Sequence, residues 1–237
     1  MKKILITFLL FSFNVSAKLN VVTSLPEFAW AVSELAGEST ETISLLNGNE
    51  DPHFVDATPS FILKTSKADM VVANGMMLEI GWLPKAIQMS GNGKVQVGAP
   101  GYCDASTLVA KAQIIKNYDR SMGDVHPVGN PHYSFSPVSM IAVMESISKC
   151  LITHLPEKEK SILANLKSAS SKLKKITEKV AMTLKPLNDK SVMTYHREFV
   201  YYFKDFGIKT AGTLEKVPGI LPSAGHLFEV AKIAKKK

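Results

Sequence analysis

The sequence predicts an α/β protein in which one long helix connects two lobes that contain parallel sheets. Strand-like apolar runs alternate with helical patterns over residues 19–97, and this alternation is typical of parallel sheets. An uninterrupted helical pattern covers residues 156–185, which at a rise of 1.5 Å per residue gives about 45 Å, longer than a single small lobe. Only two strand patterns follow it.

The elements of the first lobe are predicted from apolar runs and from the residues at their ends. Ser24 and Thr58 can cap helices, and Pro26 and Pro59 follow where a first helical turn tolerates proline. Residues 47–58 are rich in Asn, Gly, Asp and Pro, which is typical of a loop. The expected strands are Leu19–Thr23 and residues 41–46, 69–73 and 94–97, and the expected helices are residues 26–37, 59–67, 83–90 and 137–151.

The long helical segment contains no glycine and no internal proline, and Pro186 ends its pattern. Its apolar residues recur at intervals of three or four, which predicts one apolar stripe, while most of its lysines lie off that stripe. A coiled-coil partner would also explain the stripe, although the segment is short for one. We interpret it as a rigid connector that lies along both lobes. The stripe comprises Ile162, Leu166, Ala169, Leu173, Ile176, Val180 and Leu184.

Beyond the connector, the pattern predicts strands at residues 191–195 and 208–212, a helix at 196–206 between them, and a final helix from Pro222. Two strands are too few for an independent sheet. Either the C-terminal segment therefore packs on the first lobe, or part of a lobe is missing.

Residues 1–17 have the pattern of a cleaved secretory signal. Lys2 and Lys3 precede an apolar run at residues 4–13, and small residues lead to Ala17 at the cleavage position. The run is well short of the roughly 20 residues that span a bilayer, and no cysteine at the cleavage point suggests a lipid anchor. A soluble protein in the periplasm of a Gram-negative bacterium is expected.

Composition excludes several classes of protein. The chain is 46% hydrophobic and 21% charged, which excludes a disordered or collagen-like chain. Loss of the two signal lysines would lower the net charge from +7 to +5, and no aromatic residues interleave with the lysine clusters, so no nucleic acid is expected as a partner. Two cysteines are too few for a disulfide scaffold. Cys103 and Cys150 either pair in an oxidising compartment or leave a buried thiol.

Three of the six histidines lie where distant parts of the chain could meet. His53 is in a loop after a strand, His132 precedes a helix, and His196 follows a strand. Ligands of α/β sheets bind at the carboxyl ends of strands, and imidazole suits zinc better than it suits harder cations. From spacing alone, a structural or merely polar role explains each of the three better than a shared metal site. His126 is either an ordinary polar residue or an auxiliary ligand.

Local motifs around these histidines resemble those of the ZnuA/TroA-like solute-binding proteins of zinc and manganese ABC importers. The resemblance extends in order from about Val21 to the last residue, with the long helix in its expected place. The motifs are Asp51-Pro52-His53 with Thr58-Pro59-Ser60, Gly123-Asp124-Val125-His126, Gly129-Asn130-Pro131-His132-Tyr133, and Tyr195-His196 with Phe199 and Phe206-Gly207.

The resemblance implies two Rossmann-like lobes, bridged by a rigid helix, with one metal ion held between them by His53, His132 and His196. Histidine at the third position favours Zn²⁺ over Mn²⁺, because manganese proteins of the family often have Glu there. It implies a monomeric binding protein, not an enzyme, that delivers the metal to the membrane permease of an ABC importer. The expected division is a signal peptide at 1–17, an N-terminal lobe at 18–154, the helix at 155–186 and a partial C-terminal lobe at 187–237.

Two departures from the family pattern stand out. Ser136 occupies a position where the family commonly has Asp, so altered support of the site is expected. The family's fourth ligand, an acidic residue, is expected beyond Lys237, so the chain looks C-terminally truncated. Three histidines and a water could still hold zinc, as in open sites.

Two other functions remain open on the sequence. One is a secreted zinc hydrolase that uses a metal-bound water, with Glu50 or Glu198 as its base. Glu198 is two positions after His196 on the expected helix, and residues with this spacing do not face each other, so Glu198 is expected to point away from His196. The other is a nonfunctional remnant of a binding protein.

Overall fold

The computed structural model describes residues 17–119, 122–123, 125–187 and 190–235. Nearly all of the expected signal peptide, residues 1–16, lies outside this part of the chain. Among the described residues, no helix combines the length and the apolar character that crossing a membrane requires.

A four-stranded parallel sheet forms the centre of the first lobe, in the order β2-β1-β3-β4. All four side chains of β3 are buried, whereas those of the edge strand β2 alternate in exposure. This is expected for a parallel sheet that is covered on both faces at its centre. The strands are β1 (Leu19–Thr23), β2 (Thr40–Ser44), β3 (Met70–Ala73) and β4 (Tyr102–Asp104).

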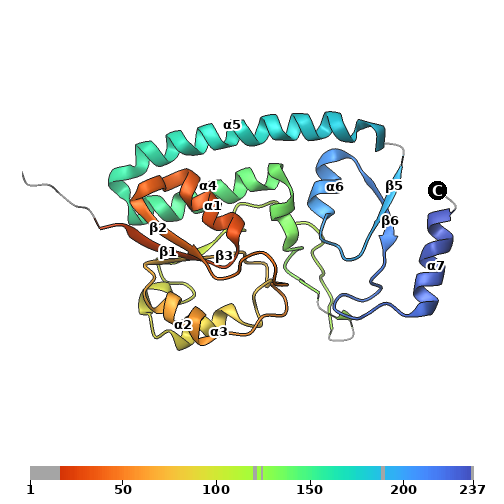
Figure 1. Ribbon diagram of the computed structural model, residues 1–237, viewed down its shortest axis with the longest axis horizontal. Helices are drawn as coiled ribbons and strands as arrows, with labels where there is room; N and C mark the ends of the chain where they lie inside the picture. Colours follow the sequence, from red (N-terminus) through yellow and green to blue (C-terminus); the bar gives the residue numbers. More distant parts are fainter. Residues whose placement is uncertain (1–16, 120–121, 124, 188–189, 236–237) are drawn as a thin grey trace, which may run out of the picture.

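Helices cover both faces of this sheet (Figure 1). Each of the four helices has proline in its first turn, and the Thr58 hydroxyl caps one of them by accepting from Phe61 N. The fully buried side chains of Phe28, Trp82 and Met144 pack the core between helices and sheet. The helices are α1 (Pro26–Ala36) and α4 (Pro137–His154) on one face, and α2 (Pro59–Ser66) and α3 (Leu83–Met89) on the other.

The fourth strand differs from the sequence expectation. Residues 94–97 were expected to form it, but Gly93–Val95 is a 3₁₀ turn and the strand is Tyr102–Asp104. A Cβ at Gly101 would lie 2.5 Å from Asp69 O and 2.6 Å from Lys94 O, so the chain enters this strand through a gap that only glycine fits. A strand of three residues carries too little alternation to be recognised in a sequence.

A disulfide joins Cys103 of β4 to Cys150 of α4, with 6.0 Å between their Cα atoms. The structure thus decides between the two alternatives for these cysteines in favour of the pair. The bond ties α4 to the edge of the sheet.

The long helix α5 (Glu159–Leu184) runs beside both lobes (Figure 1). Its N-terminal half packs on α1 and α4 through the buried residues Ile162, Ala169 and Leu173. Farther along the same stripe, Ile176 is exposed. The stripe therefore serves mainly to attach the helix to the first lobe, and its far end reaches α6 (Val200–Phe206) of the second.

The second lobe contains a separate two-stranded parallel sheet of β5 (Ser191–Thr194) and β6 (Lys209–Thr213). Its helix α6 contacts the first lobe near the 3₁₀ helix His132–Phe135, and α7 (Ala224–Lys235) follows β6. The fold is therefore α/β, with parallel sheets and one long helix, as predicted.

The helix expected to begin at His196 begins instead at Val200. Residues 195–199 are turns, because the chain needs several residues to reverse direction between a strand and the helix that packs back on it. This loop, and not a helix, carries His196.

Candidate metal centre

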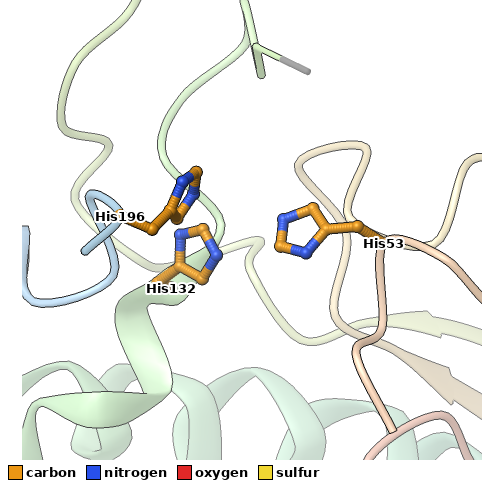
Figure 2. A group of neighbouring side chains, drawn as sticks. All are labelled: His53, His132 and His196. Atoms are coloured by element: carbon orange, nitrogen blue, oxygen red, sulfur yellow. The ribbon is translucent and has the colours of Figure 1, made fainter. Parts of the chain in front are cut away.

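Three histidines from three distant segments converge between the lobes (Figure 2). His53 comes from the loop after β2, His132 begins the 3₁₀ helix before α4, and His196 follows β5. One ring nitrogen of each lies within 4.8 Å of the chosen nitrogens of the other two. The structure thus brings together the three residues that the sequence singled out.

The spacing of the rings fits a common ion. A tetrahedral zinc ion with Zn–N bonds of about 2.0 Å places imidazole centroids about 3.2 Å from the metal, and therefore about 5.2 Å from one another. The observed centroid separations are 5.2 Å for His53–His132, 5.8 Å for His53–His196 and 5.0 Å for His132–His196. A metal ion can therefore be held with little movement of the loops.

Each of these rings is oriented by a hydrogen bond at Nδ1. His53 donates to Asp51 Oδ1 at 2.7 Å, His132 to Asn130 Oδ1 at 3.0 Å, and His196 to Glu215 Oε2 at 2.6 Å. Because these acceptors occupy Nδ1, the lone pair of each neutral ring is on Nε2, which is the usual arrangement of metal-binding histidines. His53 Nε2 is buried and has no hydrogen-bond partner among the described residues, so it is an unsatisfied atom that a metal ion would satisfy.

The electrostatics of the site keep His132 neutral. Burial, followed by the neighbouring His53, His196 and His126, lowers the pKa of His132 to about 2. A neutral imidazole is the form that binds metal. Partial burial works to raise the pKa of Asp51, but the hydrogen bonds from the backbone and ring of His53 outweigh it, and that pKa is lowered. Asp51 is therefore a carboxylate, suited to accept the proton of His53.

A buried side chain of the first lobe's core holds the loop that carries His53. The indole of Trp82, which is fully buried, donates from Nε1 to Pro52 O at 2.9 Å. The backbone N–H of His53 also donates to Asp51 Oδ1 at 3.0 Å, which closes a local turn. The residue before His53 is thus attached to the first lobe's core, and the ring is presented from a rigid loop.

Asn130 fixes His132 and also reaches the second lobe. Its Oδ1 accepts from both the backbone N–H and the ring of His132, each at 3.0 Å. Its Nδ2 donates to Gln113 Oε1 at 3.0 Å and to Arg197 O at 2.9 Å. Since Arg197 is the neighbour of His196, one amide group connects the surroundings of two of the three histidines.

Ser136 supports the site differently from an acidic residue. Its Oγ accepts from Val138 N and Ser139 N and so caps α4. The hydroxyl also makes a short hydrogen bond to Asp205 of α6. A carboxylate is thus present next to this position, but it comes from the second lobe.

Sequence reasoning missed Glu215. This residue follows β6 as His196 follows β5, and its side chain is buried. Its Oε1 accepts from Gly219 N at 3.1 Å while Oε2 holds His196. The sequence contained a signal for this residue. Neighbouring parallel strands end at the same edge of a sheet, and Glu215 is the first acidic residue after the strand predicted at residues 208–212.

Two cavities flank the histidine cluster, and both His132 and His196 line each of them. The first, of about 170 Å³, is also lined by His126, Asn130 and Arg197. The second, of about 260 Å³, is also lined by Asp51, His53, Phe135, Glu198 and Glu215. The site is therefore accessible from two sides.

The two acidic residues considered as bases for a hydrolase differ in their placement. Glu198 lines the second cavity, contrary to the expectation that it points away, because residues 195–199 are turns. Its Oε2 is buried without a hydrogen-bond partner among the described residues. Glu50 is exposed and accepts from Asn47 N at 3.0 Å. Neither carboxylate belongs to the group of ligand atoms within 4.8 Å.

A family model described as "Zinc-uptake complex component A periplasmic" (ZnuA) matches residues 21–237. The zinc-binding lipoprotein AdcA of Streptococcus pneumoniae is 27% identical over 220 residues, which are 92% of this chain and 43% of AdcA. The high-affinity zinc uptake system protein ZnuA of Haemophilus ducreyi is 27% identical over 242 residues, 95% of this chain and 76% of that protein. The manganese ABC transporter substrate-binding lipoprotein PsaA of S. pneumoniae is 28% identical over 201 residues, 83% and 62% of the two chains. The chain thus spans less than half the length of AdcA.

Solved structures show the same fold. A crystal structure of ZnuA superposes with a TM-score of 0.78 at 22% identity, over 93% of this chain and 79% of that one. FpvC of Pseudomonas aeruginosa in complex with Mn²⁺ also gives 0.78 at 22% identity, over 93% and 77%. Zn(II)-bound AdcA gives 0.72 at 25% identity, over 93% and 44%. The predicted two-lobed α/β architecture with its long helix is confirmed by these likenesses.

Proposed function

Because the chain belongs to the family of periplasmic zinc-uptake complex components A, we propose that it captures Zn²⁺ between its lobes for an ABC importer. The observation that carries the proposal is the cluster of His53, His132 and His196, whose ring nitrogens lie within 4.8 Å of one another. Each ring is already oriented by an acceptor at Nδ1, so these three residues are the proposed metal ligands.

Zinc is the proposed cargo because of the donor set. Three imidazole nitrogens suit zinc, whereas manganese prefers oxygen ligands. Relatives of the chain include both zinc-binding and manganese-transporting proteins, so the preference rests on the ligands of this chain. Zn²⁺ is expected to displace Mn²⁺ from the site.

The arrangement of the ligands suits capture and release. His53 and His132 belong to the first lobe and His196 to the second, so movement of one lobe would remove one ligand from the other two. In the proposed role, a membrane permease receives the ion when the lobes separate. The chain would act as a monomer in the periplasm after removal of residues 1–17, with lobes at 18–154 and 187–237 and the connecting helix at 155–186.

The hydrolase alternative is less well supported. The relatives described above are a zinc-binding lipoprotein, a substrate-binding lipoprotein of a manganese ABC transporter and a protein of a zinc uptake system. A hydrolase with a metal-bound water would also need a base close to the ligands. Glu50 accepts a backbone hydrogen bond in an exposed loop. Glu198 lines the cavity of about 260 Å³, but its carboxylate does not belong to the group of ligand atoms within 4.8 Å. We therefore propose binding of zinc without turnover of ester or peptide substrates.

The test is a calorimetric titration of zinc into purified residues 18–237, with chelator competition if binding is tight. One site of sub-micromolar affinity is expected, and it should be lost in His53→Ala, His132→Ala and His196→Ala. His154→Ala is the matched control, since that ring bonds Pro100 O at 3.1 Å and lies outside the cluster. Binding that is absent, or that persists unchanged in His196→Ala, would contradict the proposal.

A further inference from the structure

A fourth imidazole lies against the histidine cluster on the side of the smaller cavity. The ring centroid of His126 is 5.3 Å from that of His53 and 6.2 Å from that of His132. His126 is 9% exposed and lines the cavity of about 170 Å³ together with His132 and His196. Four of the six histidines of the chain therefore gather at one place.

The position of this ring is close to that of a fourth ligand. Tetrahedral coordination by imidazoles requires centroids about 5.2 Å apart. The separation of His126 from His53 meets this value, while its separation from His132 exceeds it by about 1 Å. His126 does not belong to the group of atoms within 4.8 Å, so its side chain must move toward the other three rings to reach a bound ion.

The backbone around His126 holds the ring near this position. Gly129 N donates to His126 O at 3.1 Å, and Ile115 N donates to Pro127 O at 3.1 Å. Gly129 has a φ of +139°, and a Cβ there would lie 3.2 Å from Lys111 Cβ, so glycine is required for this turn. His126 and His132 are thus presented by one defined turn, six residues apart.

We propose that His126 completes the coordination of the metal as a fourth imidazole ligand that closes on the ion from the smaller cavity. This inference rests on the proposed function, because it concerns the same site. The fourth nitrogen would replace a water or an oxygen ligand, and a site of four nitrogens discriminates more strongly against Mn²⁺ than a site of three.

The charges around the cluster favour this ligand set. Four neutral imidazoles leave the +2 charge of the ion uncompensated. The carboxylates of Asp51 and Glu215, which hold the rings of His53 and His196, supply two negative charges next to the ligands. A carboxylate bound directly to the metal is therefore unnecessary for charge balance.

Glu198 is the competing fourth ligand among the described residues. It lines the larger cavity, of about 260 Å³, with a buried Oε2 that has no hydrogen-bond partner in the described chain. His126 lines the smaller cavity and Glu198 the larger one, and neither residue lines both. Variants of the two residues can therefore identify which one binds.

The experiment uses residues 18–237 loaded with Zn²⁺ for X-ray absorption and with Co²⁺ for visible spectroscopy. The variants are His126→Phe, which keeps a ring, His126→Gln, which keeps a polar side chain, and Glu198→Gln. Circular dichroism of the metal-free proteins shows whether each variant folds. Chelator competition gives the zinc affinity, and displacement by Mn²⁺ gives the discrimination.

Four imidazoles around zinc in the wild type are expected, and three in both His126 variants, with a zinc affinity at least tenfold lower and weaker discrimination against Mn²⁺. Glu198→Gln should match the wild type. Wild-type spectra and affinity in both His126 variants, with binding abolished in His196→Ala, would overturn the inference and leave the proposed function intact. A change confined to Glu198→Gln would overturn it in favour of the carboxylate. A folded wild type that binds no metal would overturn the proposed function and this inference together.

Discussion

Glu215 Oε2 lies 2.6 Å from Nδ1 of His196, and the two residues follow neighbouring parallel strands. The backbone repeats this connection, since Glu215 N donates to Tyr195 O at 2.9 Å. The end of β6 thus sets the orientation of a ring that the end of β5 carries. A carboxylate at Nδ1 also makes Nε2 a better electron donor to a metal.

Glu215→Gln is expected to lower the zinc affinity by about tenfold or more. The amide can still accept from His196, so the ring stays in place, but the negative charge is lost. Competition against a chelator of known affinity measures the effect. Glu229→Gln removes an exposed carboxylate that pairs with Lys232 on α7 and serves as the control. Equal affinities in the two variants would show that the charge of Glu215 does not support the site.

The lowered pKa of His132 predicts a loss of stability in acid for the metal-free protein. The folded pKa is about 2, whereas the unfolded value is about 6.5. The folded state therefore binds fewer protons, and the contribution of His132 to the free energy of unfolding falls as the pH drops from about 6.5 toward 2. The slope is at most about 1.4 kcal/mol per pH unit. Urea unfolding between pH 7 and pH 4 should show a shallower decline in His132→Gln, and an unchanged slope would contradict the prediction.

Glu79 predicts a pH dependence of the opposite sign. Burial raises its pKa to about 7, although Asn74 N donates to its Oε1 at 2.6 Å. Because an acid with a raised folded pKa binds more protons when folded, its contribution is fully present below about pH 4.5 and is lost as the pH rises to about 7.

Glu79→Gln should remove this loss, since the amide oxygen can still accept from Asn74 N. At pH 8 the variant is expected to be more stable than the wild type by up to about 3 kcal/mol. Urea unfolding of both proteins at pH 4.5 and pH 8 measures it. A variant that is equally destabilised at both pH values would indicate a packing defect and not the loss of a charge.

The Cys103–Cys150 disulfide is expected to contribute about 2–4 kcal/mol to the free energy of unfolding. The two cysteines are 47 positions apart in the sequence, so the bond closes a loop of the chain that extends from β4 to α4. Urea unfolding with and without reductant should show this loss in the wild type. The double variant Cys103→Ala/Cys150→Ala is the control and should be indifferent to reductant. Zinc affinity of the reduced, folded protein should stay the same, because neither cysteine lines the cavities beside the histidines.

The sequence was sufficient for the elements with strong local signals. The bounds of α1, α2 and α4 are close to the expected ones because proline marks the first turn of each. Thr58 caps α2 as expected, but the prediction that Ser24 caps α1 was wrong, because the N-cap of α1 is Leu25 and no side chain caps it. The strand β4 was not found, and the start of α6 was predicted four residues too early, since both positions depend on packing against parts of the chain that are distant in the sequence.

The candidate site shows the same division between local and distant information. Motifs around His53, His132 and His196 were visible, and the structure places these three rings together, although their role as ligands stays a prediction. The partners of the rings were harder to find. Glu215 became recognisable only once β5 and β6 were paired, and the position of Glu198 depended on the helix beginning at Val200.

The amide of Asn130 has a consequence for how an ion would leave. Its Oδ1 aligns His132, while its Nδ2 donates to Arg197 O in the other lobe. Parting of the lobes must break the bond to Arg197, which leaves Gln113 as the one remaining acceptor of Nδ2 among its two described partners and so weakens the restraint on the group that aligns His132. Opening of the lobes would then move His196 away and loosen the alignment of the His132 ring at the same time. If the three histidines bind a metal ion, opening of the lobes would therefore lower the metal affinity more than the loss of His196 alone.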